Sequence, residues 1–496
     1  MKTERERRDR GDLIEGRFRG ESEKAPAGER RLRLRIGSLD RAAAILSEAG
    51  GRFIGLFVTE TPERSLLVVF ALRGELVSLR APLARDHAAY ASLSLQLPAC
   101  RLSERELSEQ CGLVPLGHPD LAPLLRPNAD ELRRRVRGVE SFVIPYGPVR
   151  SGVFEAVQFV IETGGEDVLA LELRPFFKRR ELEARFRGLS FEHGVILAER
   201  VAGIASVAHA VAFAEAVERA LGVVAPRRAA MWRGVLAELE RIANHLDVAA
   251  RLAEDTALSV GNARFTILKE NVLRLQAAMT GSRFGRGVVV PGGIRFEPQI
   301  GLEALCEELS RLERELARDR ELLMRTTSFT DRLIGTGRLD RATIEAFAGV
   351  GPLARAAGLS IDARFERPYG AYRRLGFEVV IRESGDAMAR LEVRLGEIRQ
   401  SLHLIRQAID SLGRRHGHLR ADLPDGGGAA FGWSEAPQGE LVYWVEIEGG
   451  QLRHTHVLSP SFRNWPLFPE SFRGDVLTDF AFIEHSFGLT PAGADR

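Results

Sequence analysis

Cysteine is scarce in this chain, and long apolar runs are absent. Only three cysteines, Cys100, Cys111 and Cys306, occur in 496 residues, with no C-x-x-C pair and no histidine at metal-ligand spacing. This argues against a disulfide framework, a zinc site and a four-thiolate metal site, and it fits a reducing compartment. No run reaches the ~18–20 apolar residues of a membrane span, and the first residues are charged, unlike a signal peptide. We therefore expect a cytoplasmic chain with no membrane span of its own.

Excess charge of one sign is also lacking. The chain has 70 Lys+Arg against 68 Asp+Glu, and the net charge is +2. Acidic residues are interleaved with the arginines, so no basic stripe indicates nucleic-acid binding. Neither a G-x-G-x-x-G after a strand nor a G-x-x-x-x-G-K-S/T motif is present, so we do not expect this chain to bind a nucleotide itself.

The patterning predicts an α+β fold in three parts. Residues 1–30 are rich in charge and poor in apolar anchors, which predicts a disordered tail. Residues 31–140 alternate strand and helix patterns, which predicts a small α+β module. Residues 141–496 contain long amphipathic stretches, which predict a large, mainly helical bundle domain with peripheral strands.

Local patterns place the individual elements. In the module, apolar alternation over 31–36 predicts a strand, 39–50 predicts a helix, and Arg73-Gly74 predicts a hairpin. The prolines of 102–127 argue against regular structure there. In the larger domain we expect strands over 142–176 broken at Gly164-Gly165, and a hairpin around Gly449-Gly450. Helical spacing over 235–246, 305–324 and 386–413 predicts an antiparallel bundle.

The module resembles the 30-kDa-type subunit of respiratory complex I. That family carries an E-R-E…G…G-H-P-D-L pattern, and the matching residues here are Glu104, Arg105, Glu106, Gly112, Gly117, His118, Pro119, Asp120 and Leu121. Gln110 and Cys111 stand where the family has a Met-Phe pair. The resemblance implies a docking module.

The rest of the chain is similar to the 49-kDa-type subunit of complex I. It is even more similar to the large subunit of membrane-bound, energy-converting nickel–iron hydrogenases of the group 4, formate hydrogenlyase type. The matching stretches, in order, are IPYGPVRSG, FKRRELE, ERVAGIASVAHA, LAELERIANHL, TGSRFGRGVVVPGG, GPLARAAGLSIDARFERPYGAY, EAPQGE and SPSFRNWP. A fusion of the two subunit types is itself known in the hydrogenase branch.

The resemblance implies four cysteine thiolates for nickel and iron, and none is present. The two places of the first element are Ala202 and Ala205, and those of the C-terminal element are Thr490 and Gly493. Neighbouring family residues remain, namely Arg200, Gly203, His209, Asp495 and Arg496. Because methyl, hydroxyl and hydrogen cannot replace soft thiolates, we expect no nickel–iron centre and no metal bound by this chain.

The complex I branch lost the same thiolates and binds a quinone in the vacated cleft. A histidine of its early Gly-Pro-x-His loop is linked to quinone protonation, and Arg150 occupies that place here. A second family histidine is replaced by Arg179, while Arg180 and Glu183 remain. A guanidinium stays charged and cannot donate a proton as an imidazole does. We therefore expect an acceptor that departs from conventional quinone chemistry, with a quinone-like molecule still open.

Six residues are candidates for the lining of this former cofactor or quinone cleft. They are Arg150, Arg179, Glu183, Arg200, His209 and Asp495. Four of them have a structural alternative: His209 on its apolar helix could be a satisfied core residue, and Glu183, Arg200 and Asp495 could pair with one another when buried.

Two further groups have the same ambiguity. One helix face carries Glu238, Arg241 and His245. This face could be a proton-relay stripe, or it could be an ordinary solvated or interface face. Arg355, Asp362 and Arg364 fit the family pattern, and they could face an iron–sulfur partner or maintain the fold.

The resemblance implies a peripheral subunit on the cytoplasmic face of the inner membrane. Its expected partners are an iron–sulfur small subunit, a ferredoxin-like subunit and integral-membrane, antiporter-like subunits, with the iron–sulfur cluster held by the partner and NADH received elsewhere. The expected activity is that of an NADH dehydrogenase-like oxidoreductase coupling electron transfer to ion translocation. The alternative is a non-catalytic scaffold that holds the iron–sulfur subunit on the membrane arm. A working hydrogenase and a stand-alone enzyme are disfavoured.

Overall fold

The computed structural model describes residues 21–84, 89–124, 140–150, 156–413 and 417–496. The chain divides into two compact units, the first made of residues 1–127 with Glu345–Ala348, and the second of the remainder. The predicted domain boundary at 140/141 adjoins residues 125–139, which lie outside the described part, and it stays a prediction.

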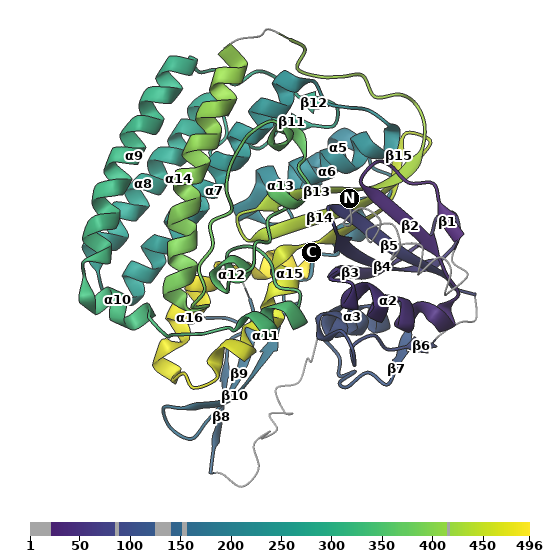
Figure 1. Ribbon diagram of the computed structural model, residues 1–496, viewed down its shortest axis with the longest axis horizontal. Helices are drawn as coiled ribbons and strands as arrows, with labels where there is room; N and C mark the ends of the chain where they lie inside the picture. Colours follow the sequence, from purple (N-terminus) through teal and green to yellow (C-terminus); the bar gives the residue numbers. More distant parts are fainter. Residues whose placement is uncertain (1–20, 85–88, 125–139, 151–155, 414–416) are drawn as a thin grey trace, which may run out of the picture. The chain divides into compact units, whose positions relative to one another are not determined.

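The first unit is built on one five-stranded sheet, drawn in purple in Figure 1. Its order is β1 (Glu21–Glu23), β2 (Glu29–Arg33), β5 (Glu75–Pro82), β4 (Ser65–Leu72) and β3 (Arg52–Thr59). The predicted hairpin joins β4 to β5, and Arg73 and Gly74 both have positive φ, as a two-residue hairpin turn requires. Helix α2 (Leu39–Glu48) buries Leu39, Ala42 and Leu46 in the core of this unit.

Two predictions for this unit were wrong. The tail predicted over 1–30 includes β1 and the start of β2, because backbone pairing of β1 with β2 orders a charged strand without apolar burial. The stretch 102–127 contains α3 (Arg101–Cys111), since its prolines all follow the helix, which ends at Gly112 in the left-handed conformation. The rest of the predicted tail, residues 1–20, lies outside the described residues.

Helix α3 places Glu104, one of the residues that match the E-R-E pattern, in the interior of this unit. The Glu104 carboxylate is fully buried and accepts hydrogen bonds from the Ser92 hydroxyl (2.7 Å) and the Leu93 N–H (2.8 Å). Short strands β6 (Ala89–Ala91) and β7 (Val114–Leu116) pair in parallel on either side of it in sequence. Glu104 is therefore a structural anchor, because a buried carboxylate must be supplied with donors.

The second unit contains the predicted antiparallel bundle. Helices α7 (Arg227–Asp255), α8 (Ser259–Thr280), α9 (Leu302–Met324) and α14 (Ala387–Gly413) lie side by side in Figure 1. Each presents an apolar stripe inward; in α9 it is formed by Leu305, Leu309, Leu312, Leu316 and Leu323. The bundle and the sheets together confirm the predicted α+β class.

A three-stranded sheet packs against α6 (Ser206–Leu221) beside the bundle. Its strands β13 (Gly428–Ala436), β14 (Gly439–Glu448) and β15 (Gln451–Leu458) run antiparallel in sequence order. Strand β14 is buried along nearly all its length. Gly432 lies so close to α6 that a Cβ there would clash with the helix backbone at Ala212 and Ala216. This sheet and α6 position the candidate site.

The other elements of the second unit are short. The predicted broken strands form a sheet of β8 (Phe142–Tyr146), β9 (Gln158–Thr163) and β10 (Val168–Arg174), with the turn at Gly164-Gly165. The remaining described ones are β11 (Val289–Val290), β12 (Gly293–Ile294), α4 (Leu182–Arg185), α5 (Phe191–Ala198), η4 (Gly203–Ala205), α10 (Thr327–Leu333), α12 (Pro352–Ala356), α13 (Ala363–Glu366), η5 (Gly370–Arg373), α15 (Pro460–Asn464), η6 (Trp465–Leu467), η7 (Pro469–Phe472), η8 (Leu477–Asp479), α16 (Phe480–Phe487) and α17 (Pro491–Asp495). Helix α11 (Arg341–Ala346) begins in this unit, and its last two residues belong to the first.

In the described residues, no single helix is long and apolar enough to cross a bilayer. One pair passes a length-and-composition test only when joined, namely Phe191–Ala198 with Gly203–Leu221, and it is bent by 111°.

Candidate functional site

The four positions that would carry thiolates lie in two segments far apart in sequence. Ala202 precedes η4 and Ala205 ends it, directly before α6. Thr490 precedes α17 and Gly493 lies within it. All four residues are buried.

Arg180 links these two segments. Its guanidinium donates to the carbonyls of Arg200 (2.8 Å) and Val201 (2.7 Å) on one side and to that of Ala492 (2.9 Å) on the other. A planar guanidinium can serve several acceptors at once. Arg180 therefore holds the two former ligand segments together by hydrogen bonds to their backbone.

Asp495 fixes the loop that leads into Arg180. Its two carboxylate oxygens accept hydrogen bonds from the N–H groups of Phe176 (2.9 Å) and Lys178 (2.8 Å). Phe176 has a φ of 75°, a conformation that is costly for a non-glycine residue. The predicted site residue Asp495 thus has a structural role: it ties the C-terminal segment to the loop before α4.

Glu183, on α4, is held by the end of strand β15 and by the C-terminal arginine. Its Oε1 accepts from the Val457 N–H (2.7 Å) and lies 3.0 Å from His456 Nδ1 and 3.5 Å from Arg496 Nη1. Burial alone would raise the pKa of Glu183, but Arg496 and His456 outweigh it, and the pKa falls to about 2. Glu183 is therefore ionised at neutral pH.

His209 is buried on α6 beneath the first segment. Its Nδ1 lies 2.7 Å from the Tyr443 hydroxyl of β14, and the two rings meet edge to face. Burial, reinforced by the nearby charge of Arg180, lowers the pKa of His209 to about 3. His209 is therefore a neutral, hydrogen-bonded core residue, as its structural alternative predicts, and it lies close enough to Arg180 to sense the charge there.

Arg150 binds a different set of residues from those that Arg180 binds. It makes a two-pronged ion pair with Glu484 of α16 at 2.7 and 2.8 Å, and it lies 5.1 Å from the centres of the Tyr146 and Phe159 rings. Burial opposes its charge, but Glu484 outweighs burial and raises the pKa of Arg150. A guanidinium fixed in this way is a permanent positive charge.

The aromatic side chains around Arg150 lead back to the former ligand segment. The Phe159 ring centre lies 6.2 Å from that of Trp465, and the Trp465 indole N–H donates to the Thr490 carbonyl at 3.5 Å. Aromatic rings packed in this way fix one another's positions but carry no charge. Arg150 is thus separated from Thr490 by two aromatic residues.

Arg179 and Arg200 are not brought into the site. The only described bond of half-buried Arg179 is from its backbone N–H to the Phe176 carbonyl. The Arg200 side chain is 52% exposed and donates to the Ile196 carbonyl of the preceding helix at 2.6 Å. Of the six predicted residues, Glu183 and Asp495 bond to backbone next to the segments that Arg180 joins, and His209 senses the charge of Arg180.

The donor set does not fit a nickel–iron centre. The four positions present two methyl groups, one hydroxyl group and one hydrogen, and none of these is a thiolate. An added Cβ at Gly493 would lie 3.1 Å from Ser459 Oγ and 3.2 Å from Thr490 Cγ2, so a larger side chain there would force its neighbours apart. In the part of the chain that the structure describes, no group of three or more His, Cys, Asp or Glu residues could hold a metal ion.

A second group of charges lies inside the bundle, and we call it the buried ionic cluster. It consists of Glu238, Arg241, His245, Arg355, Asp362, Arg364, Arg394, Glu397 and Glu435. Arg355 donates to Glu397 (2.7 Å) and Glu435 (2.8 Å), and Arg364 donates to both Glu238 and Asp362. All nine side chains are buried, so the solvated-face interpretation of Glu238, Arg241 and His245 is wrong, and Arg355, Asp362 and Arg364 face the interior instead of a partner.

Charge pairing decides the ionisation of this cluster. Burial would raise the pKa of Glu238, but Arg364 and Arg241 outweigh it and lower the pKa to about 2. Arg355 likewise overcomes burial at Glu397 and holds its pKa well below its usual range. Guanidinium groups keep these carboxylates ionised in a setting that would otherwise neutralise them.

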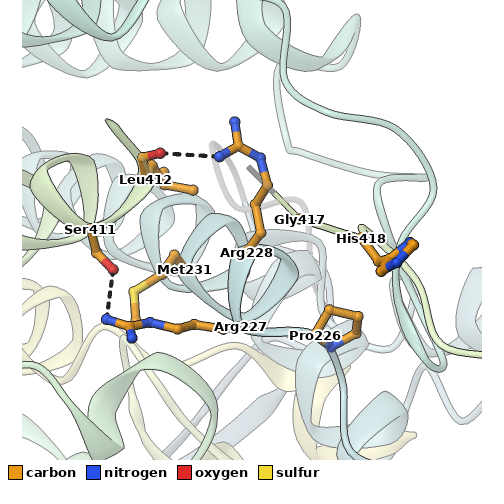
Figure 2. A pocket seen from close by; sticks show the side chains of 8 residues that line it. All are labelled: Pro226, Arg227, Arg228, Met231, Ser411, Leu412, Gly417 and His418. Carbon is orange, nitrogen blue, oxygen red and sulfur yellow. Dashed lines mark hydrogen bonds between the residues drawn. The ribbon is translucent and has the colours of Figure 1, made fainter. Parts of the chain in front are cut away.

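A pocket of about 260 Å³ lies elsewhere in the unit, between the start of α7 and the end of α14. Figure 2 shows that its two arginines are engaged: Arg227 donates to the Ser411 hydroxyl and Arg228 to the Leu412 carbonyl, both at 3.1 Å. Met231 and Leu412 add apolar lining. None of the predicted site residues lies in this pocket.

Several site residues were missed by sequence reasoning. Arg180 was recognised only as a retained residue, although the bond pattern makes it central. Tyr443, His456 and Glu484 carried no local signal, because their partners are distant in sequence; Arg150 and Glu484 are separated by 334 positions. The only sequence signal for Arg180 was its place in the FKRRELE stretch that matches the family.

The chain is similar to subunits of complex I and of membrane-bound hydrogenases. Residues 263–426 match the family model described as respiratory-chain NADH dehydrogenase, 49 Kd subunit. The chain is 28% identical to formate hydrogenlyase subunit 5 of Escherichia coli (strain K12), over 85% of this chain and 79% of that protein. It is 27% identical to the membrane-bound hydrogenase subunit alpha of Pyrococcus furiosus, over 73% and 89% of the two chains.

A fused relative and a solved structure complete the comparison. The chain is 33% identical to the NADH-quinone oxidoreductase C/D protein of Rhodopseudomonas palustris (strain BisB18), over 60% of this chain and 51% of that protein. A chain in the structure of the membrane-bound sulfane sulfur reductase, an archaeal respiratory membrane complex, shares the fold with a TM-score of 0.67 at 24% identity. That match covers 72% of this chain and 98% of the other.

Proposed function

We propose that this chain, a relative of complex I 49-kDa-type subunits and of the large subunits of membrane-bound hydrogenases, is an oxidoreductase subunit that works without a nickel–iron centre. It serves as a peripheral subunit of a membrane-bound complex and couples electron transfer at an adjacent iron–sulfur subunit to ion translocation. One observation supports this proposal most. Arg180 joins the two segments that contain the four thiolate-replacing residues, so their arrangement is kept although none of the four is a cysteine.

The hydrogen bonds of Arg180, Glu183 and Asp495 preserve the backbone around the emptied positions. These bonds stabilise the fold, so they serve an electron-transfer role and a scaffold role equally. The relatives named above are subunits of oxidoreductase complexes, which favours an electron-transfer role over the scaffold alternative.

An exposed surface beside the first segment supports docking of a cluster-bearing partner. We call it the rim; it consists of Ile196, Arg200, Ile204, Phe284 and Arg286. Arg286 lies over the Phe284 ring and donates to the Ser206 hydroxyl, which places Phe284 next to the loop that contains Ala202 and Ala205. Exposed apolar residues with arginines among them are typical of a protein–protein interface.

The identity of Arg150 favours an acceptor outside conventional quinone chemistry. A guanidinium paired with Glu484 cannot release a proton to a reduced quinone. A quinone-like acceptor would have to take its protons from other groups. The remaining expected partners are a ferredoxin-like subunit and integral-membrane, antiporter-like subunits, with this chain on the cytoplasmic face of the inner membrane.

The test is purification of the intact complex from native membranes, with identification of its subunits. Metal analysis and EPR of the reduced sample are expected to show iron–sulfur signals and no stoichiometric nickel. With added quinones, turnover should change little in Arg150→Gln. One nickel per chain together with hydrogen evolution would overturn the proposal, and quinone turnover abolished by Arg150→Gln would contradict the non-standard acceptor.

A further inference from the structure

The negative and positive charges of the buried ionic cluster are equal in number only if the His245 imidazole is neutral. It contains the carboxylates of Glu238, Asp362, Glu397 and Glu435 and the guanidinium groups of Arg241, Arg355, Arg364 and Arg394. Among the described residues, Arg394 has no carboxylate within bonding distance; it donates to the carbonyls of Arg390 (3.2 Å) and Phe487 (2.7 Å), and its charge acts on Glu397 from the next turn of α14.

Hydrogen-bond accounting indicates that all four carboxylates are ionised. Glu435 accepts from Arg355 and from the Ala363 N–H (2.9 Å), and Asp362 accepts from Arg355 and Arg364. Glu238 accepts from Arg241, Arg364 and the hydroxyls of Tyr372 and Ser401. A protonated carboxyl would need an acceptor for its O–H. Guanidinium and backbone N–H groups can only donate, so these partners offer no acceptor to Asp362 or Glu435. At Glu238, where two hydroxyls are also present, Arg364 and Arg241 favour the ionised form by lowering its pKa.

The remaining carboxylate, Glu397, fixes the tautomer of His245. His245 Nε2 lies 2.8 Å from Glu397 Oε2, so the ring hydrogen must be on Nε2. His245 Nδ1 is then a lone pair; it is buried and has no hydrogen-bond partner among the described residues. An unpartnered buried acceptor is unusual and calls for an explanation.

We propose that His245 is a proton-accepting group inside the bundle: its Nδ1 binds one proton from solvent when negative charge is added to the complex, and Glu397 stabilises the imidazolium that forms. The inference deepens and rests on the proposed electron-transfer function. One N–H bond forms, no bond between heavy atoms changes, and Glu397 stays ionised throughout. A carboxylate that orients an imidazole and supports its charge is a recurrent arrangement in proton-transfer sites.

Burial, together with two nearby arginine charges, keeps His245 Nδ1 unprotonated at rest. Burial opposes protonation most, Glu397 of α14 favours it, and Arg394 of α14 and Arg241 of α7 oppose it, so the pKa of His245 falls to about 4. On the other helices beside α7, two cations pair with carboxylates on α7 itself: Lys269 of α8 with Asp247, and His485 of α16 with Asp255. Other charged groups there pair away from His245: Arg264 of α8 with Asp319, Glu270 of α8 with Arg283, Glu484 of α16 with Arg150, and Glu218 of α6 with Arg233. An added negative charge would counter the arginines and raise the proton affinity of Nδ1.

The first experiment is NMR of the full-length chain with ¹⁵N-labelled histidine rings, with His245→Asn to assign the signal. At neutral pH we expect a neutral ring with hydrogen on Nε2, which protonates more than one pH unit below an ordinary histidine. Glu397→Gln should shift hydrogen to Nδ1, because the new amide can donate to Nε2. Replacing the exposed His403 of α14 with Asn serves as the control and should leave the His245 signal unchanged.

Hydrogen on Nδ1 or a charged ring at neutral pH would overturn the proposal. The same holds if the ring takes up no proton before the near-UV circular dichroism signal of folding is lost. These measurements need no partner subunit, so they stand apart from the proposed function.

The second experiment counts protons taken up when the purified membrane complex is reduced in weakly buffered solution. His245→Asn should accept the same number of electrons as the wild type and take up one proton fewer per chain. Equal proton uptake would overturn the role of His245. If the wild-type complex accepts no electrons, the proposed function fails, while the ring titration still decides the protonation site.

Discussion

At the residue scale, the Arg180 guanidinium joins two distant backbone segments by hydrogen bonds. Arg180 donates to three carbonyls from two segments that are more than 290 positions apart, as its bonds to Val201 and Ala492 show. Hydrogen bonds from a charged donor are stronger than neutral ones. The two segments are therefore joined by charge-assisted hydrogen bonds to their backbone.

Arg180→Ala should destabilise the chain because three backbone carbonyls lose their donor. The expected loss is about 2 kcal/mol in the free energy of unfolding, measured by denaturant titration. Arg179→Ala is the matched control, since its half-buried side chain has no described bond, and it should change the value by less than ~0.5 kcal/mol. Equal effects of the two substitutions would show that the junction does not depend on Arg180.

The buried His209 should make stability depend on pH in a defined direction. Its folded-state pKa of about 3 lies below the ordinary value, so on acidification the unfolded chain binds the proton first. The His209 contribution to stability is therefore complete above the ordinary histidine pKa and is lost as the pH falls toward about 3.

His209→Gln should remove this contribution. The difference in unfolding free energy between wild type and variant should shrink by about 1.4 kcal/mol per pH unit below the ordinary histidine pKa. Denaturant titrations at pH 7, 6 and 5 measure it, with exposed His403→Gln as the control. A difference independent of pH would show that His209 is not held neutral.

At the element scale, helices α7 and α14 are joined by charges as well as by apolar packing. Glu397 of α14 accepts from His245 of α7 and from Arg355 of α12, so three elements depend on one carboxylate. Breaking a buried pair leaves an uncompensated charge, which costs far more than loss of an exposed pair. The buried ionic cluster therefore fixes how these helices face one another.

Glu397→Gln should lower the free energy of unfolding by about 3–5 kcal/mol, because the Arg355 charge loses a partner. On the same helix, Glu392 forms a half-exposed pair with Arg382 at 2.5 Å, and Glu392→Gln should cost less than ~1 kcal/mol. Thermal and denaturant unfolding compare the two. Similar costs would mean that the cluster contributes no more than a surface ion pair.

At the scale of the whole molecule, the rim is the surface that we propose for docking of a partner subunit. Ile204 and Phe284 are 39% and 43% exposed next to the first former ligand segment. Exposed apolar side chains at such a place are expected to be covered by a partner. The same surface would then set the distance between the partner's cluster and this chain.

Phe284→Asp should reduce co-purification of the cluster-bearing partner at least tenfold, because a charge would be buried in the interface without a partner. Val260→Asp is the matched control, since Val260 is 77% exposed on α8, the helix that ends just before Phe284. Quantitative mass spectrometry of the tagged complex measures both. Unchanged partner recovery with Phe284→Asp would place the docking surface elsewhere.

How far sequence reasoning reached differed between elements. The helices α9 and α14, the β4–β5 turn and the β14–β15 hairpin followed from local periodicity and turn chemistry, which depend on neighbouring residues. Helix α3 was missed because its prolines were weighed over a whole stretch, although they fall after its last residue. Strand β1 was missed because pairing with β2, and not its own residues, orders it.

The residue types alone determined that four ligand positions carry no thiolate, because coordination depends on the chemical identity of a side chain and not on its surroundings. Only the tertiary structure decided which charges meet. Arg180 reaches Ala492, and His245 reaches Glu397 from 152 positions away. Such contacts, and the burial that shifts the pKa of each group, are set by the packing of distant segments, which no local pattern encodes.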